Sequence, residues 1–168
     1  QALAWGRAAD AGRIHVLSGR TDAPGAVDTL VANLRHACAA APDRQISLEP
    51  LNPVDHPGYW LCDFDRAGAV IAEVGAPNLS LQFDAWHARR IDGDALRAWR
   101  AHGAGAGHVQ IAGLAARGAP DPDAPAEAAL LRAIAASFTG WIAAEYACGD
   151  DPCDWLATLR GLAPGAVR

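Results

Sequence analysis

The sequence contains no lysine and no methionine, and all fourteen of its basic residues are arginine. Without lysine, no residue of this chain can form a lysine Schiff base or act as a general-base lysine. The abundance of Ala, Gly and Arg is typical of the codon usage of a GC-rich genome. Because Gln1 stands within a helical pattern and Met is absent, we expect the natural protein to have a further N-terminal region.

Positive charge and long apolar runs are also scarce. The net charge is −5 at pH 7, whereas affinity for nucleic acid depends on a basic surface, so we expect no nucleic-acid partner. No apolar run approaches the roughly 20 residues that span a bilayer, so we expect no membrane association. The 168 residues, 51% of them hydrophobic, predict a single globular domain over residues 1–168.

Cysteine is sparse and shows no CxxC spacing. The four cysteines are Cys38, Cys62, Cys148 and Cys153. Cys148 and Cys153 could meet across a loop, but free or buried thiols are the favoured interpretation. This usage fits a reducing compartment, so the expected location is cytoplasmic.

Strand-like and helical patterns alternate along the chain. Apolar stretches of strand length cover residues 14–17, 46–51, 78–83, 108–112 and 141–145. Helical spacing of apolar residues predicts helices over 1–11, 27–41, 64–74, 94–101, 126–138 and 154–162. The alternation repeats at about 30 residues, which is typical of βα units.

Two α/β architectures fit this alternation. One is a (β/α)8 TIM barrel, present as about five βα units of an incomplete barrel, since a whole barrel needs roughly 250 residues. The other is an open, doubly wound sheet of five strands, which usually binds phosphate at a Gly-rich first βα turn. The turn Ser18-Gly19-Arg20 is a poor version of that motif, so the incomplete barrel is preferred.

Four of the strand patterns end on a residue that offers an oxygen ligand. These residues are Glu49, Asp84, Gln110 and Glu145. The carboxyl ends of barrel strands lie on one face, so we expect the four side chains to converge there. Carboxylate and amide oxygens suit Mg or Mn rather than Zn. A single acid at a strand end is better explained as a helix cap, but four in register favour a metal site.

Five segments carry a family resemblance, in order and with matching spacing. They are SLEPLN at 47–52, PGY at 57–59, LQFDAWH at 81–87, HVQIA at 108–112 and GWIAAEY at 140–146. Together they resemble the hydroxypyruvate isomerase family of the xylose isomerase-like TIM barrel superfamily. The resemblance covers nearly the whole chain and begins near the helix after the third barrel strand. It therefore implies that the first three barrel strands lie outside this sequence.

The resemblance also implies a metal-assisted isomerase. It implies that Glu49, Asp84, Gln110 and Glu145 bind a divalent ion, Mg or Mn, and that Glu49 and Glu145 are the catalytic pair that transfers protons. The ion would chelate a small hydroxy-carbonyl compound and make an enediolate accessible, so that ketone and aldehyde interconvert. The implied reaction converts hydroxypyruvate to tartronate semialdehyde.

Four further residues are candidates for substrate binding. His87 resembles the substrate-contacting histidine of the family, and Arg117 matches an arginine in the loop after residues 108–112. Asn52 and Asp55 follow Glu49 on the same face. A loop hydrogen bond for His87 and a solvated surface charge for Arg117 stay open as alternatives, and His15 is interpreted as a structural histidine within its strand.

Three departures from the family pattern keep other functions open. Gly113 replaces a frequent acidic residue, and Ala119 stands where an acid usually follows the arginine. Ala147 and Cys148 stand where the family commonly has Lys-Pro. The alternatives are a ketose 3-epimerase or other sugar isomerase of the same superfamily, and a non-catalytic metal-binding remnant. A phosphodiester-cleaving relative would need a richer His and Asp cluster and a basic groove. The expected partner is a small hydroxy-carbonyl acid or sugar, and a homo-oligomer is possible.

Overall fold

The computed structural model describes residues 1–147 and 153–162. The chain forms two compact units, Gln1–Gln82 and Phe83–Arg168. Cys148, one of the two cysteines considered for a contact across a loop, lies outside the described residues. Cys38 and Cys62 are free thiols, and Cys153 Sγ lies 3.5 Å from the Tyr146 hydroxyl.

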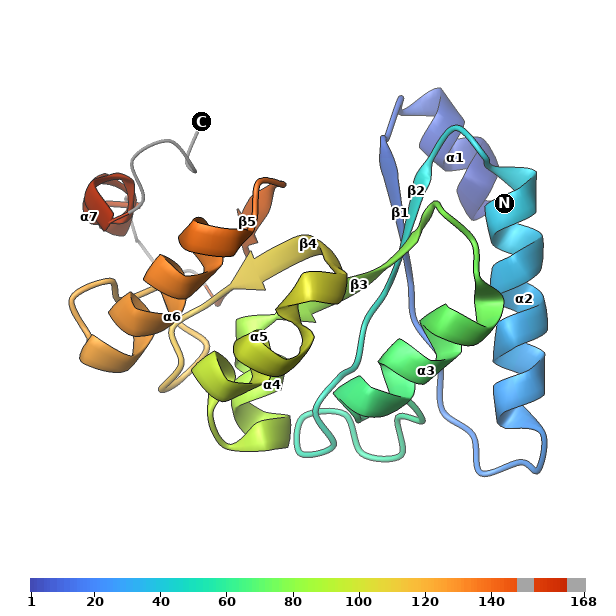
Figure 1. Cartoon of the computed structure of the whole chain (residues 1–168), viewed down its shortest axis with the longest axis horizontal. Helices are drawn as coiled ribbons and strands as arrows, with labels where there is room; N and C mark the ends of the chain where they lie inside the picture. The colour runs from blue at the N-terminus through green and yellow to red at the C-terminus, as the bar shows by residue number, and fades with distance from the viewer. Residues whose placement is uncertain (148–152, 163–168) are drawn as a thin grey trace. The chain divides into compact units, whose positions relative to one another are not determined.

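The first unit contains three helices and a parallel arrangement of strands (Figure 1). Its elements are α1 (Ala2–Ala8), β1 (Arg13–Val16), α2 (Ala26–Ala40), β2 (Gln45–Leu48), α3 (Phe64–Val74) and the first part of β3 (Leu79–Asp84). In the parallel pairs, Arg13 aligns with Gln45 and Ile46 with Leu79. α2 and α3 pack against each other and bury residues at helical spacing, which are Leu30, Val31, Leu34 and Cys38 on α2 and Phe64, Ala67, Val70 and Val74 on α3.

Local signals explain the position of α3 and the join between α2 and β3. The Asp63 side chain accepts a hydrogen bond from the Arg66 backbone N–H at 2.6 Å, and Gly75 ends α3 in the left-handed conformation at φ 67°. The Nδ2 of the buried Asn78 side chain donates to the carbonyl oxygen of Cys38 in the last turn of α2. It also donates to the carbonyl oxygens of Ala41 and Arg44, which follow the helix. Asn78 therefore satisfies carbonyls that the end of a helix leaves unpaired.

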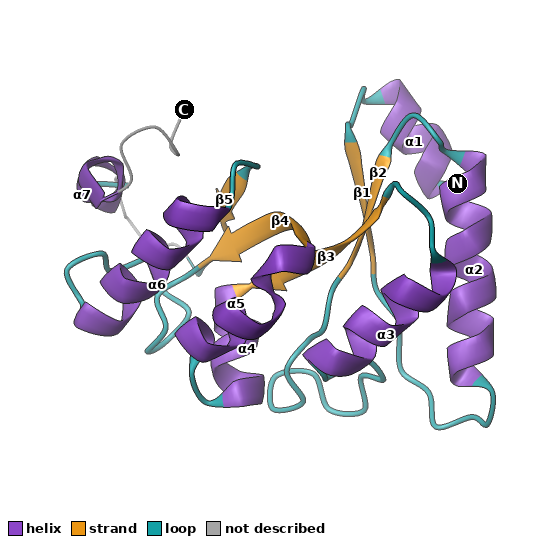
Figure 2. Cartoon of the chain, viewed as in Figure 1, coloured by secondary structure: helices purple, strands orange, loops and turns teal. Residues whose placement is uncertain are grey.

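The second unit begins within β3 and places several helices beside β4 (Figure 2). Its elements are α4 (Ala85–Asp92), α5 (Ala95–His102), the 3-10 turn η1 (Gly103–Gly105), β4 (Ala106–Ile111), α6 (Pro125–Ser137), β5 (Ile142–Ala144) and α7 (Trp155–Leu162). β4 pairs in parallel with β5, and Val109 aligns with Ile142. Trp99 packs edge-on against Phe83 and Phe138, with ring centroids 5.1 and 6.1 Å apart, and this cluster forms part of the core.

The helix α4 is a feature that the sequence patterns did not predict. Its eight residues, AWHARRID, include two arginines and show no extended apolar stripe. The helix forms because Asp84 is both the last residue of β3 and the N-cap of α4, while Gly93 ends the helix at φ 81°. A helix that follows a strand with no loop between them leaves little sequence signal of its start.

The strand order distinguishes the two architectures considered for the sequence. The five strands are ordered β1-β2-β3-β4-β5, which is the order of the sequence. An open doubly wound sheet reverses its strand order at a switch point, whereas a barrel adds each strand beside the previous one. The prediction of an incomplete (β/α)8 barrel of five βα units is therefore confirmed, and the single domain over residues 1–168 stays a prediction.

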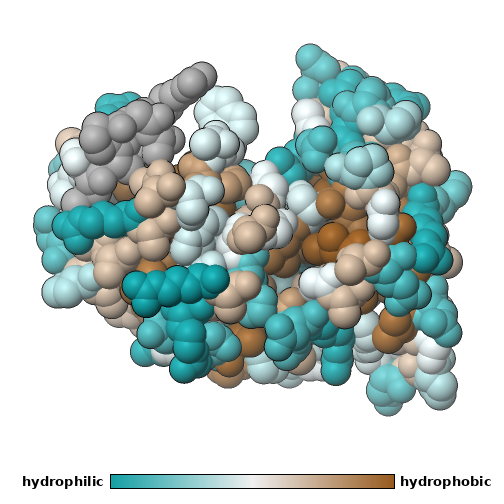
Figure 3. Space-filling view, viewed as in Figure 1, coloured by the Kyte–Doolittle hydropathy of each residue, from teal (hydrophilic) through white to brown (hydrophobic). Residues whose placement is uncertain are grey.

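On the face drawn in Figure 3, hydrophilic and hydrophobic residues are interspersed. Among the described helices, none combines the length and apolar character required to cross a membrane.

Candidate active site

The four predicted metal ligands lie at or near the carboxyl ends of four strands. Glu49 directly follows β2, Asp84 ends β3, Gln110 is the penultimate residue of β4, and Glu145 directly follows β5. Glu49 belongs to the first unit and the other three residues to the second. Each unit therefore builds its own cluster of polar residues.

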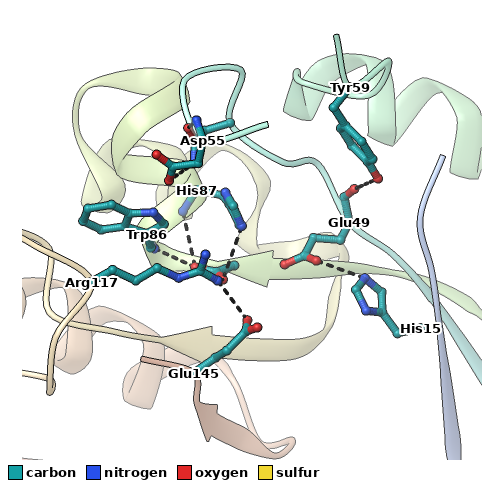
Figure 4. A network of polar contacts seen from close by, with 10 residues as sticks. His15, Glu49, Asp55, Tyr59, Trp86, His87, Arg117 and Glu145 are labelled. Carbon is teal, nitrogen blue, oxygen red and sulfur yellow. Dashed lines mark hydrogen bonds and ion pairs between the residues drawn. The ribbon is translucent and has the colours of Figure 1, made fainter. Parts of the chain in front are cut away.

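In the first unit, Glu49 is held by a histidine from the neighbouring strand (Figure 4). His15 Nε2 lies 3.0 Å from Glu49 Oε2. His15 aligns with Ser47 between β1 and β2, and Glu49 follows Ser47 by two residues, so strand periodicity brings His15 and Glu49 to the same face. His15, interpreted from sequence as a structural histidine, is thus a direct partner of Glu49.

The second oxygen of Glu49 differs from the first. Glu49 is 3% exposed, and its Oε1 is buried and accepts no hydrogen bond from any residue in the described part of the chain. A buried carboxylate oxygen without a partner is costly, because it has lost its bonds to water. A divalent cation would satisfy this oxygen, so the environment of Glu49 fits a metal ligand.

Tyr59 fixes the backbone beside Glu49. Its hydroxyl donates to the Glu49 carbonyl oxygen at 3.1 Å and accepts from the Ser18 backbone N–H at 2.9 Å. Burial raises the pKa of Tyr59, although the bonds with Ser18 act in the opposite direction. The hydroxyl therefore keeps its proton at neutral pH and ties the segment after β1 to the segment after β2.

Asn52 shapes the loop that carries Asp55. The Asn52 Oδ1 accepts from the backbone N–H groups of Val54 and Asp55 at 3.1 and 2.9 Å, and its Nδ2 donates to Asp55 Oδ2 at 2.9 Å. Asn52 is fully buried. These bonds give Asn52 a structural role in the turn, and contact of either residue with a substrate stays a prediction.

In the second unit, Asp84 combines two roles that the sequence treated as alternatives. Its Oδ1 accepts from the backbone N–H groups of Trp86 and His87 at 2.7 and 3.3 Å and so caps α4. Its Oδ2 lies 3.8 Å from His87 Nε2 and 3.7 Å from Arg117 Nη2. One oxygen serves the helix while the other faces groups that carry or can carry positive charge.

Arg117 joins Asp84 to Glu145. The same nitrogen, Nη2, lies 3.3 Å from Glu145 Oε2, and Figure 4 shows the Arg117 side chain extended toward Glu145. The side chains of Arg117 and Glu145 are 27% and 51% exposed, whereas that of Asp84 is 1% exposed. Both ion pairs use Nη2, and within residues 1–147 and 153–162 the other N–H groups of this guanidinium have no acceptor, so they could bind a further one.

Gln110 lies on the same face of its strand pair as Glu145. It aligns with Ala143 across the β4–β5 pair, and Glu145 follows Ala143 by two residues. Side chains two residues apart along a strand share a face, so Gln110 and Glu145 lie on one side of the pair. The structure thus brings together Asp84, His87, Arg117 and Glu145 in the second unit, and convergence of all four predicted ligands on one ion stays a prediction.

Comparisons with known proteins place these residues in a family context. A family model described as xylose isomerase-like TIM barrel matches residues 1–164. The chain is 37% identical over 141 residues to 2-oxo-tetronate isomerase of Cupriavidus necator, a match that covers 80% of this chain and 54% of the relative. It is 33% identical over 152 residues to hydroxypyruvate isomerase of Escherichia coli, covering 86% of this chain and 59% of the relative.

Solved structures give the same fold. A crystal structure of an AP endonuclease, family 2, from Brucella melitensis matches with a TM-score of 0.82 and 28% identity, covering 93% of this chain and 64% of that one. A structure of L-ribulose 3-epimerase matches with a TM-score of 0.68 at 20% identity, over 98% of this chain and 61% of that one, and shows the fold alone. The chain spans somewhat more than half the length of the curated relatives that it matches. These matches confirm the resemblance that the five sequence segments indicated.

Proposed function

This chain belongs to the xylose isomerase-like TIM barrel family, and we propose that it is the carboxyl-terminal part of an isomerase that acts on a small hydroxy-keto acid. The relatives named as hydroxypyruvate and 2-oxo-tetronate isomerases support this substrate class. The observation that carries the proposal is the pair of buried carboxylates at strand ends, Glu49 and Asp84, each with one oxygen beside a basic side chain.

The proposed metal ligands are Glu49, Asp84, Gln110 and Glu145, and the proposed ion is Mg or Mn. The buried, unsatisfied Oε1 of Glu49 supports this set, as do the hard oxygen donors at each position. When bound, the ion supplies positive charge that stabilises negative charge developing on the substrate oxygens.

Glu49 and Glu145 are the proposed proton-transfer pair. With hydroxypyruvate as substrate, one carboxylate removes a proton from C3 and the other delivers a proton to C2. The hydroxyl proton passes from the C3 oxygen to the C2 oxygen, so a ketone with a primary alcohol becomes an aldehyde with a secondary alcohol and no atom is gained or lost. Positioned carboxylates of this kind contribute roughly 10²–10⁴-fold to such transfers.

The proposed substrate contacts divide by chemistry. The planar guanidinium of Arg117 suits the carboxylate of a keto acid, because it can offer two parallel N–H bonds. His87 and Asp55 are proposed to contact substrate oxygens, and Asn52 is proposed to act alongside them. A homo-oligomeric assembly and a cytoplasmic location also stay proposals.

A ketose 3-epimerase or other sugar isomerase is the alternative activity, because two carboxylates beside a metal would serve it equally well. Arg117 favours the acid, since a neutral sugar offers no anionic partner for the guanidinium. A non-catalytic remnant is the alternative from another class, favoured by the departures at Gly113, Ala119 and Ala147.

The test is an assay of the whole natural protein on hydroxypyruvate and on a ketohexose. We expect turnover of hydroxypyruvate that is lost on metal chelation and restored by Mg or Mn. Glu145→Gln should still bind the substrate but lose turnover by at least about 100-fold. Faster turnover of the ketohexose would support the sugar alternative, and turnover of neither compound would support the remnant.

A further inference from the structure

A buried glutamate, Glu127, closes the loop that carries Arg117, and nothing in the sequence patterns drew attention to it. We propose that Glu127 is a positioning residue for Arg117: it holds both ends of the loop 114–121, and through that loop it sets the affinity of the site for a substrate carboxylate. This inference depends on the proposed function for its substrate, but its structural part can be tested without any activity.

The first observation is that the Glu127 carboxylate accepts two hydrogen bonds from backbone N–H groups. Its Oε1 accepts from the Leu114 backbone N–H and its Oε2 from the Asp121 backbone N–H, each at 2.7 Å. Glu127 is 7% exposed and lies in the first turn of α6. Short bonds from backbone N–H groups to a carboxylate are among the strong hydrogen bonds of proteins. One side chain thus fastens two backbone positions that are seven residues apart.

The bonds are directed to the loop and not to the helix that carries Glu127. A glutamate in the first turn of a helix would ordinarily be explained by a favourable interaction with the helix dipole or by a capping box. Here no side-chain hydrogen bond caps α6, and Asp121 Oδ1 accepts from the backbone N–H groups of Asp123 and Ala124 in the turn before the helix, while both oxygens of Glu127 accept from Leu114 and Asp121. Glu127 is therefore left to bridge the loop.

The loop also folds back tightly on Gly113, the residue before its first fastened end. The Gly113 N–H donates to Gly118 O and the Arg117 N–H donates to Gly113 O, both at 2.9 Å. A Cβ atom at Gly113 would lie 2.5 Å from Ala119 O, so this close approach requires glycine. The family's frequent acidic residue at position 113 is thus incompatible with the turn observed here.

Arg117 occupies the costly position of this turn. Its φ is 52°, in the left-handed region that residues with a Cβ rarely adopt, and such a conformation persists only where its surroundings impose it. Its carbonyl oxygen accepts from the Ala147 N–H at 2.9 Å, so its backbone is held on both sides. The guanidinium then reaches Asp84 and Glu145. The clamp by Glu127 is the buried, charged element that maintains this arrangement.

The experiment uses the full-length enzyme and a double-mutant cycle on Glu127→Gln and Arg117→Ala. An amide at position 127 keeps one acceptor oxygen and turns an NH₂ donor toward the second backbone N–H, so one end of the loop is released. We expect the KM for hydroxypyruvate to rise about tenfold while kcat changes less than about twofold, because the loss is in substrate binding. In the Arg117→Ala background, Glu127→Gln should leave KM unchanged within about twofold.

A matched control separates positioning from general stability. Asp94 also accepts two backbone N–H bonds, from Leu96 and Arg97, but it caps α5. Asp94→Ala should lower stability without raising KM. If Glu127→Gln does not fold, Glu127→Asp retains the charge but is one methylene too short to bridge both N–H groups, and it should raise KM in the same direction.

Hydrogen exchange of the Leu114 and Asp121 amides gives a readout that needs no turnover. At least one of the two amides should exchange faster in Glu127→Gln and neither in Asp94→Ala; unchanged exchange of both amides would overturn the clamp. An equal rise in KM with and without Arg117 would overturn the positioning role. If the wild-type enzyme converts no hydroxy-keto acid while the exchange result holds, the proposed function fails and the clamp on the Arg117 loop stands.

Discussion

The two glutamates proposed to transfer protons differ in burial and in the kind of charge beside them. The Glu49 side chain is 4% exposed and its partner is His15, at 3.0 Å. The Glu145 side chain is 51% exposed and its partner is Arg117, at 3.3 Å. One carboxylate therefore faces a guanidinium, and the other faces an imidazole.

This difference teaches that two chemically identical residues at equivalent strand ends can be prepared for different tasks. Glu49 is fixed by neighbouring secondary structure: His15 stands on the adjacent strand and Tyr59 holds its backbone. Glu145 is fixed by a loop, since its partner Arg117 belongs to the segment that Glu127 closes. We therefore expect the Glu49 side chain to be the more rigid of the two.

The sharpest way to break the comparison is to remove each carboxylate charge separately. If both glutamates transfer protons, Glu49→Gln and Glu145→Gln should each reduce kcat by at least about 100-fold, and the double variant should be little slower than either one. Measurement of kcat on hydroxypyruvate with saturating Mn decides this. A single variant that retains most of its turnover would leave the other glutamate as the lone proton-transfer residue.

The Arg117 side of the comparison is tested by two substitutions at one position. Arg117→Ala and Arg117→Gly both remove the ion pairs with Asp84 and Glu145, so both should raise the KM for a keto acid by about 10-fold to 100-fold. Glycine adopts a positive φ without strain, so Arg117→Gly should be more stable than Arg117→Ala by about 1 kcal/mol. Urea unfolding measures the stability difference, and equal stabilities would contradict the strain assigned to this turn.

Much of the fold, and less of the site, could be predicted from the sequence. The helix α3 was predicted to the residue, because Asp63 and Gly75 mark its two ends and its apolar residues repeat at helical spacing. The neighbours of the site residues could not be predicted in this way. His15 is brought beside Glu49 by the register of β1 and β2, although the two residues are 34 positions apart in the sequence. Glu127 accepts a hydrogen bond from Leu114 across a loop that carries no recognisable motif. Periodicity reports which face a residue occupies and not which neighbour the fold brings to it.

On the Glu49 side, removal of the histidine should cost stability. His15→Phe removes the histidine partner of Glu49 Oε2, so neither oxygen of this buried carboxylate then faces a basic group, and we expect a loss of about 1–3 kcal/mol in the free energy of unfolding. His15→Gln, which keeps an N–H donor of similar reach, is the matched control and should lose less. In a Glu49→Gln background the cost of His15→Phe should shrink, because no buried charge is then left alone. A constant cost in both backgrounds would show that His15 acts through packing.

The smallest expected effect separates the two tasks of Asp84, which is buried as Glu49 is and contacts Arg117 as Glu145 does. Asp84→Asn keeps an oxygen that can accept from Trp86 and His87, so the cap on α4 should persist and stability should change by less than about 0.5 kcal/mol. Asp84→Ala removes the cap and should cost about 1 kcal/mol. Both variants remove the negative charge, so both should weaken Mn binding in a titration followed by calorimetry. If Asp84→Asn bound Mn as tightly as the wild type, Asp84 would serve only as a helix cap, and the proposed ligand set would lose its most buried member in the second unit.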